Sequence, residues 1–168
     1  MEFYDVLKNR KSIRAYQPDP VPEEALLRIA EAVNLAPTAC NRQPFRLLLV
    51  KNAERRAEIA SVYPQKWLKE APVIAVMLSD SSQAWKRLEG DTIADVDAAI
   101  AMEHFILAAA AEGLGSCWIC AFQREVMARV LKLSAPWRVF ALSPLGYAAE
   151  GGRERVRKDL NEVCRMVD

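Results

Sequence analysis

Four residues near the start of the chain could together bind an anion. Arg10, Lys11, Ser12 and Arg14 lie within a single short stretch, in a protein whose formal net charge is only +1. In an extended segment, side chains two residues apart point the same way, so Arg10, Ser12 and Arg14 would share one face. Guanidinium and hydroxyl groups form strong hydrogen bonds to phosphate oxygens. A charged cluster can also be an ordinary solvated surface, but this spacing favours a site for a phosphate and a second electron-rich group.

Two later segments could contribute to the same site, one with polar side chains and one with glycines that let a ligand approach the backbone closely. Residues 37–45 read Pro-Thr-Ala-Cys-Asn-Arg-Gln-Pro-Phe, where the amides of Asn41 and Gln43 could pair with the heteroatoms of a ring. Taken alone, this segment could equally be a helix stop and a turn. Residues 113–122 read Gly-Leu-Gly-Ser-Cys-Trp-Ile-Cys-Ala-Phe. Their Gly-x-Gly follows a helical pattern and precedes a strand, which is the reverse of a dinucleotide-binding turn.

In residue types and in order, these three segments resemble the nitroreductase family of FMN-dependent oxidoreductases, in particular its shorter members. The resemblance continues through residues 142–150 and 157–162, so it covers nearly the whole chain apart from residues 79–90. It implies an α+β, three-layer fold with a central mixed or antiparallel sheet flanked by helices. It also implies a homodimer in which the tail, residues 151–168, packs on the partner subunit.

The resemblance also implies a role for each matched residue. Arg10, Lys11 and Ser12 would serve the phosphate and ribityl end of FMN, and Arg14 the pyrimidine edge. The backbone near Cys120 and Ala121 would address N5, so no side chain is expected to be catalytic. Glycine is common in short relatives where Cys120 stands here. The other expected FMN contacts are Pro37, Thr38, Ala39, Asn41 and Gln43 from the second subunit, Cys117, Trp118, Ile119 and Cys120 beside the ring, and Arg157 and Lys158 at the phosphate.

The activity implied is a ping-pong reaction in which NADH or NADPH reduces non-covalently bound FMN and the flavin reduces a small, flat, electron-poor acceptor such as a nitroaromatic or a quinone. Residues 81–90, with Trp85 and Arg87, could form a wall of the acceptor pocket. Family relatives also dehalogenate, dehydrogenate peptide heterocycles or cleave the flavin, and these chemistries remain open. Arg153 lies outside the matched motifs, so we expect Arg14→Ala to weaken flavin binding or reduction and Arg153→Ala to do neither.

Two other classes of function remain. Cys117 and Cys120 have the spacing of a thiol-disulfide redox pair, although in a strand residues three apart face opposite sides. A flavin-binding redox sensor without turnover is the second. No metal site is expected, because the chain has one Cys-x2-Cys pair and a single histidine, His104, within an apolar helix.

The elements that would position these residues follow from apolar periodicity and turn signals. We expect helices over 3–9, from Pro22 to near Pro37, and over 53–62, 91–112 and 125–131, with one more turn over 65–70. Strands are expected over 46–51, 73–79, 115–120 and 139–146. The helix over 91–112 is apolar on nearly every face, which indicates burial, either centrally or against another subunit.

Composition limits the number of domains and the kinds of partner that can be expected. The chain has 168 residues, 52% of them hydrophobic and 27% charged, which predicts a single globular domain over 1–168. The 23 basic and 22 acidic residues are balanced, so we expect no nucleic-acid partner and no membrane association. A cytoplasmic location is expected, because no targeting or membrane-spanning pattern is present.

Overall fold

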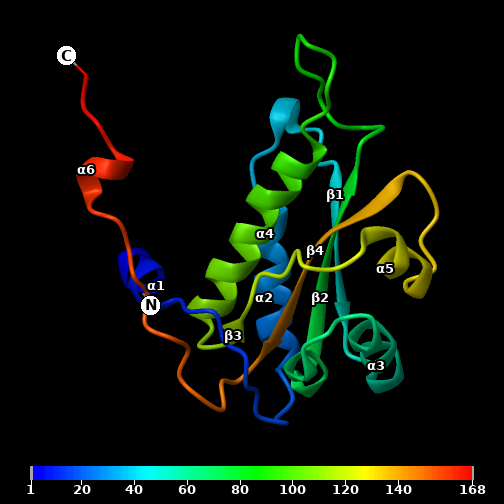
Figure 1. Cartoon of the computed structure of the whole chain (residues 1–168), viewed down its shortest axis with the longest axis vertical. Helices are drawn as coiled ribbons and strands as arrows, with labels where there is room; N and C mark the ends of the chain where they lie inside the picture. The colour runs from blue at the N-terminus through cyan, green and yellow to red at the C-terminus, as the bar shows by residue number, and fades with distance from the viewer. Residues whose placement is uncertain (1, 168) are drawn as a thin grey trace.

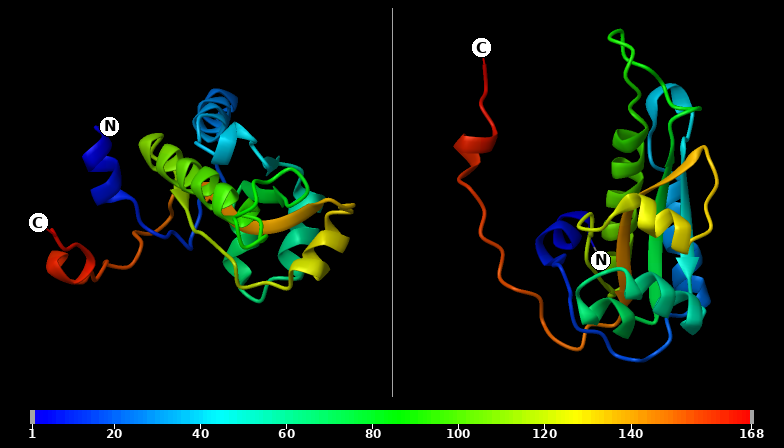
Figure 2. Two further views of the ribbon diagram at one scale, coloured as in Figure 1. Left: turned by 90° about the horizontal axis from the view of Figure 1, so that it is seen from above. Right: turned by 45° about the vertical axis from the view of Figure 1, so that its right-hand side comes forward.

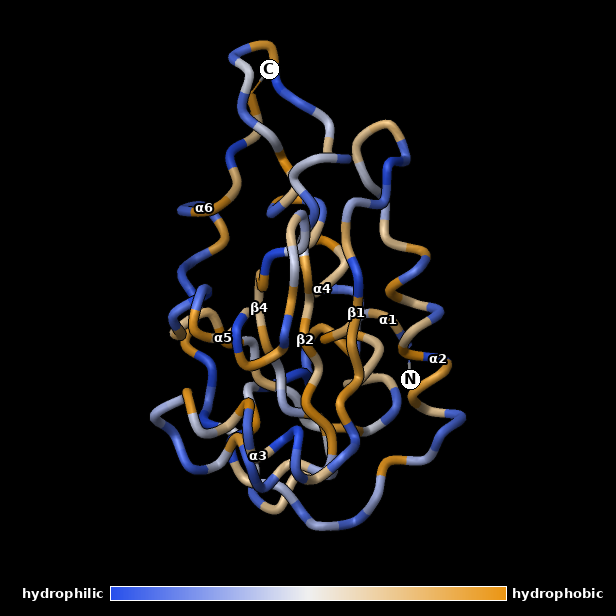
Figure 3. The backbone as a smooth tube through the Cα atoms, turned by 90° about the vertical axis from the view of Figure 1, so that its right-hand side faces the viewer, coloured by the Kyte–Doolittle hydropathy of each residue, from blue (hydrophilic) through white to orange (hydrophobic). Residues whose placement is uncertain are grey.

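In the computed structural model of the protein, which describes residues 2–167, a four-stranded antiparallel sheet forms the middle layer. The strand order is β1-β2-β4-β3. The strands are β1 (Phe45–Val50), β2 (Val73–Asp80), β3 (Gly115–Ser116) and β4 (Trp137–Gly146). The central strands are the longest, and in Figure 3 they carry long runs of hydrophobic residues.

Helices cover both faces of this sheet. The α-helices are α1 (Phe3–Asn9), α2 (Glu23–Asn34), α3 (Ala53–Ser61), α4 (Ala94–Ala111), α5 (Arg124–Val130) and α6 (Leu160–Val163), and two 3-10 turns are η1 (Ala39–Asn41) and η2 (Lys66–Glu70). Helices α2 and α4 lie on one face, and α3 and α5 lie on the other (Figures 1 and 2). The expected α+β class and three-layer fold are confirmed.

Strand β2 shows why the sheet must be covered on both sides. All its residues are buried; Ala75 and Met77 contact the core under α2 and α4, whereas Val76 and Leu78 contact the core under α3 and α5. Because strand side chains alternate between faces, burial of both faces requires an uninterrupted apolar run. Helix α4 is buried by the same layer: Met102 and Phe105 are fully inaccessible, as its all-round apolar pattern predicts.

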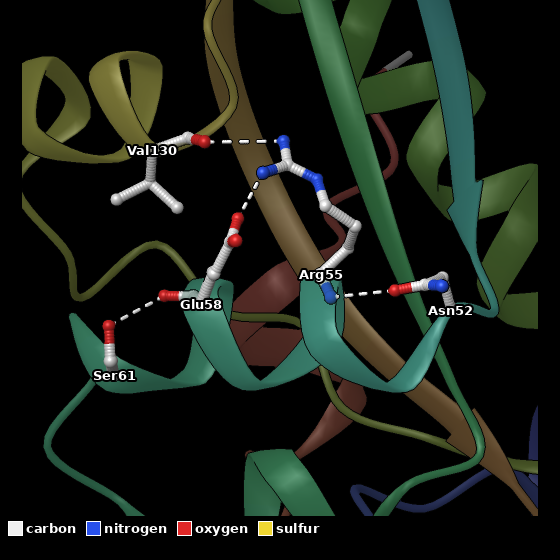
Figure 4. Close-up of polar contacts among 5 residues, drawn as sticks. All are labelled: Asn52, Arg55, Glu58, Ser61 and Val130. Carbon is white, nitrogen blue, oxygen red and sulfur yellow. Dashed lines mark hydrogen bonds and ion pairs between the residues drawn. The ribbon is translucent and has the colours of Figure 1, made fainter.

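A hydrogen-bonded link fixes α3 against α5, as Figure 4 shows. Asn52 caps α3 by accepting the Arg55 amide at 3.0 Å, and the Arg55 guanidinium donates to the carbonyl oxygen of Val130 at 3.3 Å. Arg55 also forms an ion pair with Glu58. The wall formed by these two helices therefore has a defined position relative to the sheet.

The expected strand over 115–120 is longer than the strand observed. Only Gly115 and Ser116 pair continuously with β4, and pairing returns only as an isolated bridge between Ile119 and Leu142. The gap is closed by a side chain: the Cys117 amide donates to Ser143 Oγ at 3.1 Å. Residues 117–121 consequently pair with β4 only at Ile119, and the amides of Cys120 and Ala121 are not used in that pairing.

Most of the C-terminal segment extends away from the rest of the protein. Beyond Gly151 the chain runs past α1 and ends in α6, away from both layers (Figures 1 and 2). Its large apolar side chains are exposed, with Val156 90% and Met166 91% accessible. No helix among residues 2–167 is long and apolar enough to cross a membrane.

Candidate functional site

The cationic segment, residues 10–14, is extended and joined to the edge of the sheet. The Ile13 amide donates to the Ser116 carbonyl oxygen at 2.9 Å, and Ser12 forms a parallel bridge with Ser116. Gly115 makes the approach possible, since a Cβ there would lie 2.8 Å from Ile13 Cγ1. Ile13 is buried, so this residue anchors the segment while its neighbours remain accessible.

Two cavities lie along this segment. One, of about 380 Å³, is lined by Ser12 and Arg14, whereas Arg10, which was expected on the same face, is not among its lining residues. The other, of about 280 Å³, contains Arg10 and Lys11 together with the backbone around Gly115 and Ser116. Gly151 and Gly152 line both cavities, so the start of the C-terminal segment separates them. The further members of the first cavity are Ala15, Gln65, Trp67, Glu150 and Arg153.

The cations of this segment are not paired with carboxylates in the part of the chain that the structure describes. Arg10, Lys11 and Arg14 form no hydrogen bond or ion pair to another residue of the described chain, and neither does the Gln65 side-chain amide. Elsewhere on the surface, arginines such as Arg28 and Arg124 are paired with carboxylates at 2.6 and 3.0 Å. Unpaired cations gathered at cavities are consistent with a bound anion.

A third cavity, of about 650 Å³, adjoins residues 120–123. Its walls are Val62, Pro64, Cys120, Ala121, Phe122, Gln123 and Val126. The backbone amides of Cys120 and Ala121 donate to no acceptor within the described chain, whereas the next amide, of Phe122, donates to the Cys120 carbonyl oxygen at 2.9 Å. Two free amides at the rim of a largely apolar cavity can donate to a ligand held there.

The two cysteines of this segment occupy different environments. Cys117 is buried at 4% exposure, and burial raises the pKa of its thiol, although nearby Arg14 and Ser12 act to lower it. Cys120 is exposed in the third cavity, where its sulfur accepts a hydrogen bond from Trp118 Nε1 at 3.1 Å. All four cysteines are free thiols. An attacking thiol must be accessible and ionised, so the burial of Cys117 argues against the thiol-disulfide alternative.

The loop of residues 37–43 lies at the opposite end of α4. The Ala39 amide donates to Asp97 Oδ1 at 3.0 Å, near the start of α4, whereas the cationic segment lies beside the end of α4 at Gly113. At the ~1.5 Å rise per helical residue, about 24 Å of helix separates these ends. Pro37, Thr38, Ala39, Asn41 and Gln43 are therefore not brought to Arg10–Arg14 within one subunit.

This loop is nevertheless ordered by its own contacts. Gln43 closes it twice, donating its amide to Thr38 Oγ1 at 3.0 Å and its side chain to Asn41 Oδ1 at 3.1 Å. Arg42 donates to the carbonyl oxygens of Gln83 and Ala84 at 3.4 and 3.1 Å. Asp97 is 1% exposed, and its second oxygen, Oδ2, has no partner in the described chain.

The sequence motifs did not indicate some residues that line these cavities, and they indicated others that do not line them. Gln65, Trp67 and Arg153 line the cavity of Ser12 and Arg14, although no motif indicated them. The Gly-Gly pair before Arg153 was the only available signal, since adjacent glycines permit close backbone approach. Arg157 and Lys158 line none of the three cavities, and Arg157 donates only to its neighbour's carbonyl oxygen. Their expected role at a phosphate stays a prediction.

Comparison with known proteins places this arrangement in a class. The fold is a covered antiparallel sheet whose edge carries unpaired cations and free amides, and close structural counterparts exist. A nitroreductase family protein of Clostridium novyi NT has a TM-score of 0.83 at 33% identity, over 89% of this chain and 87% of that one. A Clostridium difficile 630 nitroreductase family protein has a TM-score of 0.86 at 26% identity, over 98% of both chains.

Sequence comparison gives the family directly. The nitroreductase family model matches residues 7–63 and 60–147. The NADH dehydrogenase of Thermus thermophilus is 32% identical over 185 residues, with coverage of 92% of this chain and 90% of that protein. The FMN reductase [NAD(P)H] of Bacillus subtilis is 31% identical over 173 residues, covering 93% and 70%. The chain belongs to the nitroreductase family.

Proposed function

We propose that the protein takes hydride from NADH or NADPH and passes the reducing equivalents to flat, electron-poor acceptors such as nitroaromatics or quinones. The general class is established by the family: the protein is an NAD(P)H-dependent flavin oxidoreductase that uses FMN. Overall, one hydride leaves the nicotinamide and, with a proton from water, adds two electrons and two protons to the acceptor. The bound flavin supplies the hydride-accepting chemistry, and the protein supplies binding, orientation and charge.

The residues present fit FMN. A phosphate needs cations and donors: Arg10 and Lys11 supply cations that make no hydrogen bond or ion pair within the described chain, and Ser12 supplies a hydroxyl group. A pyrimidine edge needs both donors and acceptors, which Arg14 and the Gln65 amide supply. The third cavity includes the apolar side chains of Val62, Phe122 and Val126, which an aromatic ring can contact. The unpaired cations and free amides along one sheet edge are the single observation that carries the proposal.

Each residue then has a limited task. The unpaired guanidinium of Arg14 would stabilise negative charge on the pyrimidine edge of the cofactor, and the free amides of Cys120 and Ala121 would orient its central ring. Phe122, Val62 and Pro64 would exclude water from the ring and offer a flat acceptor an apolar surface. Among the described residues that line this cavity, Gln123 has the only amide side chain and none is charged, which favours uncharged acceptors.

We further propose that the working site forms between two copies of the chain. The loop of residues 37–43 and the cationic segment are too far apart to hold one flavin within a subunit, but an antiparallel pair of α4 helices would bring one loop to each segment. Exposed apolar surface supports this pairing. Phe3 and Tyr4 of α1 are 61% and 72% exposed, and Leu160 of α6 is 77% exposed. Beyond Arg155, which contacts α1, the C-terminal segment extends away from its own subunit and has the form of an arm that packs on a partner.

The test is an absorption spectrum of purified protein after incubation with FMN and desalting, repeated without oxygen after addition of NADH or NADPH. We expect one flavin per subunit, bleached by nicotinamide and restored by a quinone or a nitroaromatic, with parallel double-reciprocal plots. A flavin that stays oxidised with both nicotinamides would indicate a sensor. A protein that retains no flavin would contradict the proposal altogether. Sedimentation of the loaded protein tests the dimer independently.

A further inference from the structure

We propose that Arg153 is a second guanidinium at the pyrimidine edge of the flavin site and that, with Arg14, it raises the reduction potential of the bound flavin. This inference rests on the proposed function and adds a residue to its site. It reverses the expectation drawn from the motifs, which left Arg153 without a role.

Arg153 is held beside the cationic segment by the backbone on both sides of it. The preceding residue, Gly152, lies so close to this segment that a Cβ would be 2.8 Å from the Ser12 carbonyl oxygen and 3.0 Å from Lys11 Cβ. Before it, the Ala149 amide donates to the Ala15 carbonyl oxygen at 3.0 Å. These backbone contacts therefore place Arg153 at the cavity that is also lined by Ser12 and Arg14.

The chain is fixed again immediately after Arg153. Arg155 donates from its guanidinium to the carbonyl oxygens of Leu7, at 2.9 Å, and Lys8, at the end of α1. These carbonyls carry the negative end of the helix dipole and lack helical partners, so an arginine suits them. Arg153 is thus bracketed by two anchors, Gly152 on Ser12 and Arg155 on α1.

The charge in this cavity is greater than its surroundings neutralise. Arg14 and Arg153 each make no hydrogen bond or ion pair within the described chain, and Glu150 is the one acidic side chain of the cavity. Two guanidinium groups and one carboxylate among the lining residues leave net positive charge in the cavity where a ligand would lie. A ligand that gains negative charge there is stabilised in its charged form.

The Gln65 amide identifies the part of the flavin that this charge would face. Its carbonyl oxygen needs a donor and its amino group needs an acceptor, and a pyrimidine edge offers an imide N–H beside two carbonyl oxygens. A phosphate dianion offers no donor to the carbonyl oxygen. Arg10 and Lys11 line the neighbouring cavity and remain available for the phosphate.

Reduction places negative charge on this edge, so Arg153 should favour the reduced cofactor over the oxidised one. Replacing Arg153 with glutamine should weaken binding of reduced FMN about tenfold more than binding of oxidised FMN. For a two-electron couple, a tenfold change in this ratio lowers the midpoint potential by about 30 mV. Arg153 is exposed, which keeps the expected effect modest.

The experiment measures the midpoint potential of bound FMN, and the dissociation constants of FMN and riboflavin, for wild type, Arg153→Gln, Arg153→Lys and Arg165→Gln. Arg165 is the matched control, an exposed arginine of the same C-terminal segment that lines none of the three cavities. We expect Arg153→Gln to lower the potential and to weaken FMN and riboflavin equally, Arg153→Lys to recover part of the potential, and Arg165→Gln to match wild type.

Three results would overturn the inference. An unchanged potential in Arg153→Gln would remove Arg153 from the pyrimidine edge. A loss of FMN affinity with riboflavin affinity intact would place it at the phosphate instead. Equal potential shifts in Arg153→Gln and Arg165→Gln would indicate a general charge effect. Failure of wild type to bind either flavin would refute the proposed function itself, and is therefore distinguishable from all three.

Discussion

Substituting Gly115 with alanine should displace the cationic segment and weaken flavin binding. In the structure the added Cβ would lie 2.8 to 2.9 Å from three carbons of Ile13, including its Cβ, which cannot rotate away. Two carbons pack at about 3.5 Å or more, so the segment must shift by about 0.7 Å. A shift away from the sheet edge would lengthen the 2.9 Å bond from the Ile13 amide to Ser116 to about 3.6 Å, beyond hydrogen-bonding distance.

Two magnitudes follow. Overpacking of this kind costs about 1–3 kcal/mol of folding free energy, and displacing Arg14 and Ser12 by nearly 1 Å should weaken FMN binding by at least tenfold. Urea unfolding of the apoprotein and fluorescence titration with FMN measure the two effects. Ile13→Ala in the Gly115→Ala background removes two of the three contacting carbons and should restore part of the affinity. Wild-type affinity in Gly115→Ala would refute the view that this glycine positions the segment.

Two further expectations concern ionisable groups. In native protein, iodoacetamide should label Cys40, Cys120 and Cys164 but not Cys117, because Cys117 is buried and burial raises its pKa; mass spectrometry would show its labelling only after unfolding, and fast native labelling of Cys117 would restore the thiol-pair alternative. Burial raises the pKa of Asp80, but hydrogen bonds from Ser82 and Gln83 outweigh it and hold the pKa below its usual range. The stability from Asp80 is therefore present above the ordinary carboxyl pKa of about 3.9 and is lost as pH falls through the lower pKa of the folded protein. The stability difference between wild type and Asp80→Asn should shrink over that range in urea unfolding at several pH values, and a difference independent of pH would contradict this explanation.

Apolar periodicity predicted the layers well because a buried face requires apolar residues at the spacing of a helix or a strand. Helix α1 and the central strands lie where the pattern placed them, and α4 begins only a few residues later than expected. The pattern failed at residues 115–120, where apolar character continues but pairing with β4 does not. There the Cys117 amide donates a hydrogen bond to Ser143, and Ile119 forms a single bridge to Leu142. These partners are distant in sequence, so the local sequence pattern does not indicate that they replace continuous strand pairing.

The candidate site was predictable only where its residues are close in sequence. Arg10 to Arg14 form a compact motif, and period two predicts a shared face for Arg10, Ser12 and Arg14, of which Ser12 and Arg14 line the same cavity. Gln65 and Arg153 reach the same cavity from separate connections, and only tertiary contacts bring them there. Arg157 and Lys158 are the opposite case: a motif match predicts a role for them, but no contact within the described chain tests that role. Residues 85–93 form a projecting hairpin, and the expected place of residues 81–90 at the acceptor pocket remains a prediction.

Each half of the proposed flavin site is built before the halves meet. In the loop of residues 37–43, Cys40, Asn41 and Gln43 adopt positive φ, a conformation that non-glycine residues rarely take. Such a loop persists only when its surroundings hold it, and Asp97 and Thr38 do so from within the same subunit. On the other half, Gly115 and Gly152 hold the cationic segment. Because the proposed site needs both subunits, flavin affinity should depend on subunit concentration, and dilution below the dimer dissociation constant should release FMN. Because neither half must reorganise, each subunit should stay folded when FMN is released.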